Sequence, residues 1–237
     1  MIWLLHGNVG GPGDWEPVAS VLRGKGMTCE AVNLWNWIDD GVSSLTGFGR
    51  EFSRHVGGRD PESVLVGYSM GGRLAMHALL SAPSAWRRAV IVSAHPGLPE
   101  AERAARVDRD LEWARSIRDA SWEAFLEEWN DQPVFVGERR ENETCGLAIE
   151  RWSPQVARAF EVWSIGLQDD LTPGLSEAAV PVLWINGERD RKFVEAGGRV
   201  AATCLNVRHE IVPGHGHRML RSAAGELAEM ISGFVTK

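Results

Sequence analysis

A serine and its small neighbours are the residues best placed to do chemistry. Residues 67–71 read Gly-Tyr-Ser-Met-Gly, directly after a Val-rich run and directly before a helical pattern. A chain that turns sharply from strand to helix needs small residues two positions on either side of the serine, and that turn exposes the hydroxyl. Glycine-rich turns match this motif by chance, but the strand–turn–helix setting indicates that Ser69 is a nucleophile.

Such a nucleophile needs hydrogen-bond donors where negative charge develops. The amide of Met70 would lie at the N-terminus of the following helix, where backbone N–H groups are free. A second donor is expected from the loop after the first strand, where Asn8 follows His6 and Gly7. We therefore predict an oxyanion hole formed by the amides of Asn8 and Met70, and we expect His6 to be structural.

An acid and a histidine should follow the serine in chain order. Glu188 and Asp190 come after an apolar strand, and His215 and His217 come after the next one. Both groups lie at carboxyl ends of strands, where parallel sheets form ligand sites. We predict Asp190 and His217 as the partners of Ser69, with Glu188 and His215 as the alternatives.

The surrounding pattern alternates strands and helices. Apolar runs predict strands at residues 2–5, 28–34, 64–66, 89–93, 180–185 and 206–212. Helical patterns are expected at residues 14–24, 69–80 and 223–234. This alternation is typical of an α/β protein whose mostly parallel sheet is flanked by helices on both faces.

Residues 99–171 break that alternation. Their composition shifts to Arg, Glu and Trp, and helical patterns occur at residues 100–117, 121–129 and 148–163. We predict a helical cap at 99–171 inserted into a core formed by residues 1–98 and 172–237.

Composition narrows the class of protein. With 237 residues, 44% hydrophobic residues and a net charge of −7, the chain fits a globular protein that binds neither nucleic acid nor a membrane. The sparse thiols Cys29, Cys145 and Cys204 indicate neither disulfides nor a metal site. No signal peptide is evident, so a cytoplasmic location is expected. The oligomeric state stays open.

Several motifs together resemble a known family. They are Gly-Tyr-Ser-Met-Gly-Gly-Arg at 67–73, His-Pro-Gly-Leu at 95–98, Gln-Pro-Val-Phe at 132–135, and Gly-Glu-Arg-Asp at 187–190 followed by Lys192 and Phe193. Arg103, Arg106, Asp110, Trp113 and Trp129 complete the match. The chain resembles the 2-succinyl-6-hydroxy-2,4-cyclohexadiene-1-carboxylate synthases of menaquinone biosynthesis, members of the α/β-hydrolase superfamily.

The resemblance implies a lyase without metal or organic cofactor. That family eliminates pyruvate from a cyclohexene that bears three carboxylates, and its triad acts as a base. The family's arginines correspond to Arg73, Arg106 and, with looser spacing, Arg151. Arg73 also lies one helical turn after Ser69, so it can face the same cleft, and arginine binds carboxylates in bidentate geometry. Tyr68 is expected beside the nucleophile and Trp129 in the pocket wall, or else both in packing roles.

The chain departs from the family pattern in three places. It begins almost at the first strand, where a hairpin is usual, residues 33–37 read Asn-Leu-Trp-Asn-Trp, and residues 219–221 read Met-Leu-Arg. These changes bear on the substrate, so two other hypotheses stay open. A carboxylesterase would use the same triad through an acyl-enzyme, and a binding protein would use the scaffold without catalysis.

Overall fold

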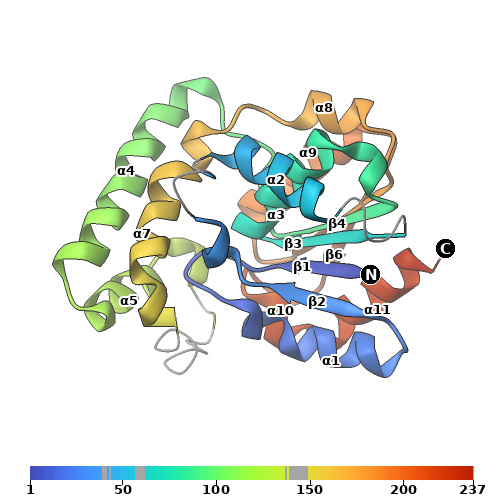
Figure 1. Cartoon of the computed structure of the whole chain (residues 1–237), viewed down its shortest axis with the longest axis horizontal. Coiled ribbons are helices and arrows are strands. Elements are labelled where there is room, and N and C mark those ends of the chain that lie inside the picture. The colour runs from blue at the N-terminus through green and yellow to red at the C-terminus, as the bar shows by residue number, and fades with distance from the viewer. Residues whose placement is uncertain (39–41, 43, 57–61, 137, 139–148, 237) are drawn as a thin grey trace.

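Six parallel strands form a single sheet in the order β2-β1-β3-β4-β5-β6 (Figure 1). The structure is a computed structural model that describes residues 1–38, 42, 44–56, 62–136, 138 and 149–236. The strands are β1 Ile2–Leu5, β2 Cys29–Val32, β3 Val64–Tyr68, β4 Arg88–Val92, β5 Val182–Gly187 and β6 Val207–Val212. Each of the six strands predicted from sequence is present, with ends shifted by a few residues. The prediction of an α/β fold with a parallel sheet is confirmed.

Alternate residues of each strand point to opposite faces of the sheet and enter two separate cores. Ile2 and Leu4 of β1 pack with one set of helices, and Trp3 and Leu5 pack with the other. The first set is α1 Glu16–Gly24, α10 Met219–Ser222 and α11 Ala224–Val235. The second set is α2 Leu45–Val56, α3 Met70–Ser81, α8 Thr172–Glu177 and α9 Arg191–Thr203.

Helices α2 and α9 were not predicted from the sequence. Each contains two glycines, which lower helix propensity and weaken the sequence pattern. The fold uses two of these glycines for close packing. A Cβ on Gly49 would lie 2.6 Å from the carbonyl carbon of His77 on α3, and one on Gly197 would lie 2.7 Å from the Trp184 ring.

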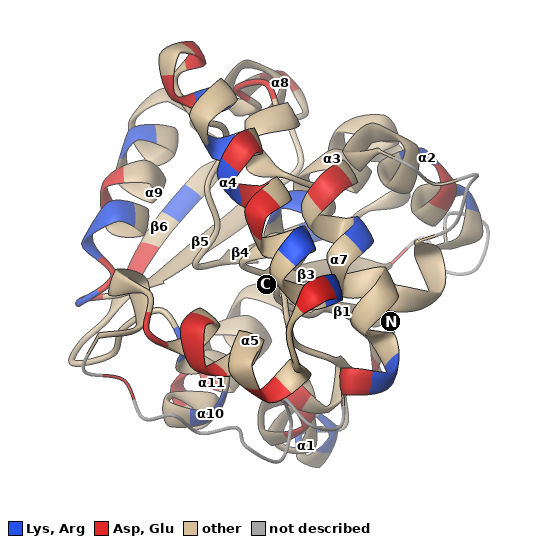
Figure 2. Ribbon diagram, turned by 90° about the vertical axis from the view of Figure 1, so that its left-hand side faces the viewer, with Lys and Arg blue, Asp and Glu red and all other residues tan. Residues whose placement is uncertain are grey.

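Of the described helices between β4 and β5, all except α8 pack beside the sheet as a group: α4 Glu100–Asp119, α5 Trp122–Asn130 and α7 Ser153–Val162 (Figures 1 and 2). Edge-to-face and stacked rings of Trp113, Phe125, Trp129 and Phe160 join them. Helix α7 starts later than predicted because Pro154 is tolerated only in a first helical turn; Ala148 lies outside the described residues. The cap boundaries at 98/99 and 171/172 remain a prediction.

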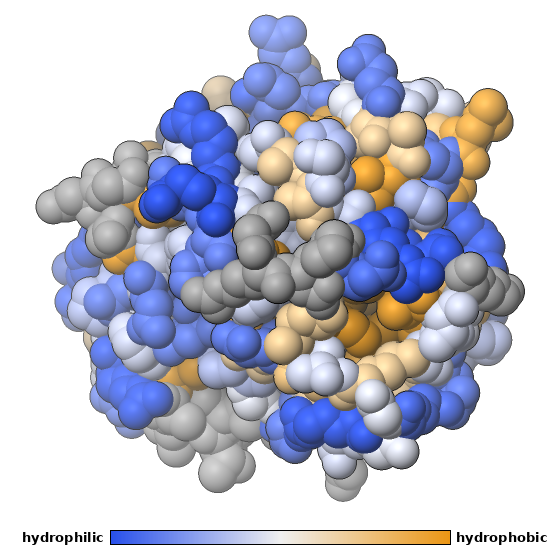
Figure 3. Space-filling model, turned by 45° about the vertical axis from the view of Figure 1, so that its right-hand side comes forward, coloured by the Kyte–Doolittle hydropathy of each residue, from blue (hydrophilic) through white to orange (hydrophobic). Residues whose placement is uncertain are grey.

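Short 3₁₀ helices complete the described structure: η1 Pro12–Trp15, η2 Leu34–Trp37, η3 Pro83–Ala85, η4 Pro133–Phe135, η5 Glu150–Trp152 and η6 Ile165–Leu167. The face in Figure 3 is mostly hydrophilic, with small apolar patches. In the described part of the chain, no helix has the length and apolar character needed to cross a membrane.

Candidate active site

Ser69 occupies a strained turn between β3 and α3. Its φ of 53° and ψ of −114° are uncommon for a residue with a side chain and cost on the order of 1–3 kcal/mol. The turn is held by Ser69 N donating to the Val92 carbonyl at 2.9 Å. A Cβ on Gly71 would lie 2.6 Å from the carbonyl carbon of Leu5, so only glycine lets α3 approach β1 this closely. The local sequence therefore forces the hydroxyl to the carboxyl edge of the sheet.

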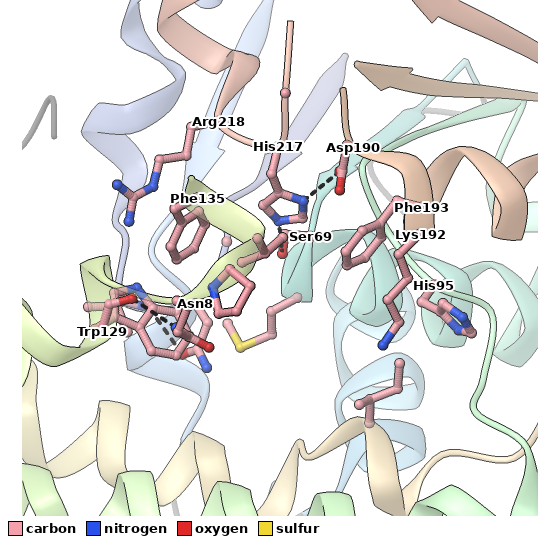
Figure 4. A pocket seen from close by; sticks show the side chains of 18 of the residues that line it. Asn8, Ser69, His95, Trp129, Phe135, Asp190, Lys192, Phe193, His217 and Arg218 are labelled. Atoms are coloured by element: carbon pink, nitrogen blue, oxygen red, sulfur yellow. Dashed lines mark hydrogen bonds and ion pairs between the residues drawn. The ribbon is translucent and has the colours of Figure 1, made fainter. Parts of the chain in front are cut away.

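Ser69, His217 and Asp190 form a continuous hydrogen-bonded series (Figure 4). His217 Nε2 lies 3.0 Å from Ser69 Oγ, and His217 Nδ1 lies 2.7 Å from Asp190 Oδ2. Because a carboxylate only accepts, the imidazole proton belongs on Nδ1 and Nε2 is free to accept from the serine. Both His217 and Asp190 are 4% exposed, so this arrangement is shielded from bulk water.

The alternative acid and histidine are engaged elsewhere. Glu188 Oε2 accepts from the Gly214 amide at 2.7 Å, and half-buried His215 pairs with Ser222 Oγ at 3.1 Å. Both contacts hold the loop at residues 214–218, called the histidine loop below, and neither involves Ser69. The loops also touch directly, since Arg189 N donates to the His215 carbonyl at 2.8 Å. Among the candidate pairs, the structure brings Asp190 and His217 to Ser69.

The candidate oxyanion donors lie beside the serine. Parallel pairing of Leu5 with Gly67 brings the ends of β1 and β3 together, and Asn8 and Met70 both line the pocket. Met70 is the first residue of α3, where an amide has no intrahelical acceptor. Their service as oxyanion donors remains a prediction.

Both ring nitrogens of His6 are hydrogen-bonded to the backbone, which fits the structural role expected from the sequence. Its Nε2 accepts from Leu34 N at 3.1 Å, so the proton is on Nδ1, which donates to the Gly7 carbonyl at 2.8 Å. Complete burial lowers its pKa to about 4, which keeps the ring neutral. Trp35 of the same unusual 33–37 segment donates to the Gly10 carbonyl at 2.9 Å. This departure from the family pattern therefore braces the loop that carries Asn8.

Two arginines predicted from the sequence lie side by side in the pocket wall. Arg73 is 8% exposed, and its Nη1 donates to the Trp163 carbonyl at 2.7 Å. Burial, and then the charge of Arg106, lower the pKa of Arg73 to about 9, so it is still a cation at neutral pH. Arg106 Nε donates to Asp110 Oδ1 at 2.9 Å, and Asp110 Oδ2 accepts from Ser164 at 2.7 Å.

The pocket above Ser69 has a volume of about 980 Å³ and a cationic lining. Four of its described lining residues are acidic, namely Asp14, Glu102, Glu138 and Asp190. Eight are basic: Arg73, Arg106, Arg109, Arg189, Arg191, Lys192, Arg218 and Arg221. In a chain with a net charge of −7, this excess of cations is local and suits an anionic ligand. Across the described residues, no three His, Cys, Asp or Glu side chains gather around a potential metal position.

Of the other residues predicted to bind substrate, Tyr68 and Trp129 line the pocket and Arg151 does not. Tyr68 lines the pocket 5.5 Å from the His217 ring, and burial raises its pKa above the ordinary value, so it stays protonated. Trp129 lines the pocket and also packs on Trp113, so both of its predicted roles fit. Arg151 is not brought to the pocket: it is exposed, with its guanidinium 5.7 Å from the Trp152 ring.

Sequence reasoning assigned no role to several residues that surround His217. Phe193 and Phe135 lie with ring centroids 4.6 and 5.9 Å from the imidazole, and Lys192 and Arg218 line the pocket nearby (Figure 4). Lys192, Phe193 and Phe135 belong to motifs that carried the family resemblance, and Arg218 directly follows the histidine. The signal available in the sequence was their position inside one of these motifs or next to a predicted catalytic residue.

The comparisons with known proteins agree with this architecture. Residues 4–230 match the alpha/beta hydrolase family. A 2-succinyl-6-hydroxy-2,4-cyclohexadiene-1-carboxylate synthase of Escherichia coli O7:K1 is 31% identical over 96% of this chain and 92% of its own length. One of Shigella dysenteriae serotype 1 is 30% identical over the same shares.

Solved structures share the fold at lower identity. MenH from S. aureus superposes with a TM-score of 0.88 at 23% identity, over 99% of this chain and 92% of that one. An esterase from Exiguobacterium antarcticum has a TM-score of 0.80 at 18% identity, over 100% and 91%. The parallel sheet, the strand–turn–helix motif around Ser69 and nearly the whole sequence agree with these proteins. This chain is therefore an enzyme of the α/β-hydrolase family and belongs with the 2-succinyl-6-hydroxy-2,4-cyclohexadiene-1-carboxylate synthases within it.

Proposed function

We propose that this enzyme eliminates pyruvate from an enolpyruvyl cyclohexene carboxylate, forming 2-succinyl-6-hydroxy-2,4-cyclohexadiene-1-carboxylate. The observation that carries the proposal is the cationic pocket above Ser69, with eight basic and four acidic side chains in the described part of its wall. The relatives named for this reaction supply the substrate class. A substrate with three carboxylates needs such a wall, whereas a neutral ester does not.

In this proposal the triad works as a base. Ser69 Oγ, whose proton is drawn by His217 Nε2, removes a carbon-bound proton from the ring. The electron pair of that C–H bond forms a new C=C bond as the C–O bond to the enolpyruvyl group breaks. The imidazolium, stabilised by Asp190, returns the proton to the departing enolpyruvate, which becomes pyruvate. The amides of Asn8 and Met70 would stabilise the enolate oxygen that develops beside the reacting carbon.

The arginines would hold the substrate for that step. Arg73 is buried, and none of the described carboxylates forms an ion pair with it. Arg106 has one of its donors occupied by Asp110 and the rest of its guanidinium available to the pocket. Of these two neighbouring cations, only Arg106 is paired with a carboxylate, which leaves an excess positive charge that a substrate carboxylate would neutralise.

The test is release of pyruvate from the enolpyruvyl cyclohexene substrate, followed with lactate dehydrogenase and NADH. We expect turnover by the wild-type enzyme and none above background by Ser69→Ala. Equal rates for the two proteins would refute the proposal.

A carboxylesterase is the second candidate, favoured by the same series of Ser69, His217 and Asp190 and by esterases among the structural neighbours. It would form an acyl-enzyme on Ser69. A burst of nitrophenol from a short p-nitrophenyl ester, without pyruvate release from the cyclohexene, would favour it over the lyase.

A further inference from the structure

The segment that follows α5 contacts the loop of the catalytic histidine through a carboxylate. Glu138 Oε2 and Oε1 lie 3.0 and 3.2 Å from the amide nitrogen of Arg218, the residue directly after His217. The same carboxylate is placed to accept from the His217 amide. Successive backbone N–H groups that converge on one anion form a specific anchoring arrangement.

Two more residues of this segment hold the side chain of Arg218. Its Nη2 donates to Asn130 Oδ1 at 2.5 Å, and its guanidinium carbon lies 3.6 Å from the centre of the Phe135 ring. Phe135 in turn lies beside His217 (Figure 4). The backbone and side chain next to the catalytic imidazole are thus both bound, by Asn130, Phe135 and Glu138.

Partial burial of the Glu138 carboxylate costs solvation free energy, which its contacts with the histidine loop offset. Glu138 is half-buried, and burial raises its pKa, while the hydrogen bond from the Arg218 amide and the positive charge of Arg218 oppose that shift. Its partners lie 80 positions further along the chain. The backbone of Glu138 is itself fixed, since its amide donates to the Phe135 carbonyl at 3.1 Å. The loop at residues 214–218 contains two glycines, so it needs outside contacts to keep one conformation.

We propose that Glu138 is a positioning residue that anchors the histidine loop to the cap, so that cap packing sets the alignment of the His217 imidazole with Ser69. The inference rests on the proposed role of these two residues as base and nucleophile. It makes Asn130, Phe135 and Glu138 part of the apparatus that orients the base, in addition to part of the pocket wall.

The test compares Glu138→Ala and Glu138→Gln with Glu127→Ala, a control that removes an exposed carboxylate of α5. We expect kcat for pyruvate release to fall about tenfold in Glu138→Ala, with KM within about twofold, because small misalignments of a catalytic group reduce rates strongly. Glu138→Gln should lie between wild type and Glu138→Ala, since its amide oxygen still accepts one N–H. Glu127→Ala should match wild type.

A second measurement does not depend on the natural substrate. The rate of Ser69 sulfonylation by phenylmethylsulfonyl fluoride, read by mass spectrometry, reports activation of the hydroxyl by His217. It should fall in the same order as kcat, with melting temperatures of the variants unchanged. Wild-type kcat and wild-type sulfonylation in Glu138→Ala or Glu138→Gln would overturn the inference, as would losses that follow melting temperature alone. Failure of the wild type itself to release pyruvate while it is sulfonylated would instead count against the proposed reaction, and the sulfonylation series would still decide the role of Glu138.

Discussion

Replacing Arg73 by alanine should separate recognition of a carboxylate from the chemistry of the triad. Arg73 is 8% exposed, donates to the Trp163 carbonyl and forms no ion pair with a described carboxylate. If a substrate carboxylate binds there, the pair is buried, and removal of one partner of a buried pair costs about 3–5 kcal/mol. The lower figure corresponds to roughly a 150-fold loss in kcat/KM.

A neutral ester would lose much less. For that substrate, Arg73→Ala removes only packing and the bond to Trp163, worth about 1 kcal/mol or roughly fivefold. Arg73→Lys should give an intermediate loss for the carboxylate substrate, because it keeps the charge and loses bidentate geometry.

The assay measures kcat/KM for pyruvate release and for p-nitrophenyl acetate hydrolysis on the same protein preparations. Arg115→Ala is the matched control, because Arg115 is an exposed cation of α4 that does not line the pocket and should change either rate by less than about 1 kcal/mol. Equal losses for the two substrates in Arg73→Ala would refute the assignment of Arg73 as a substrate clamp.

Three other outcomes follow from the geometry. Asp190→Asn should fold normally yet lower kcat by about 10⁴, because the His217 tautomer is lost; a decrease below tenfold in the pyruvate assay would contradict this. Gly71→Ala should destabilise the fold by more than about 3 kcal/mol in urea unfolding, since its Cβ would press on the Leu5 carbonyl, and a wild-type midpoint would disprove the steric argument. Stability should fall as pH drops from about 6.5 to 4, in part because buried His6 stays neutral down to a pKa of about 4 while the unfolded chain takes up a proton near 6.5, so that His6 contributes at most about 3 kcal/mol. His6→Gln should flatten this pH dependence, and unchanged slopes in the two proteins would exclude His6 as its source.

The amino-acid sequence by itself determined the features that depend on neighbouring residues. The strand–turn–helix motif at residues 67–71 is one, because the requirement for glycine at 67 and 71 around Ser69 is a steric property of five consecutive positions. The six parallel strands are another, since buried strands read as short apolar runs between turns. Helices α2 and α9 escaped prediction because each contains two glycines, one of which serves a close contact with another element, and such contacts do not appear in a local pattern.

The tertiary structure alone decided which side chains meet. His215 and His217 are two residues apart, and only the contacts between the β5 and β6 loops turn His217 toward Ser69 while His215 faces Ser222. Arg151 was a loosely spaced match to the family's arginines and is exposed, whereas Arg218 matched none of the motifs considered and lines the pocket. The contact between Glu138 and the histidine loop joins residues 80 positions apart. A site at the carboxyl edge of a sheet is assembled from distant loops, so its residue types can be anticipated from sequence while their directions depend on packing.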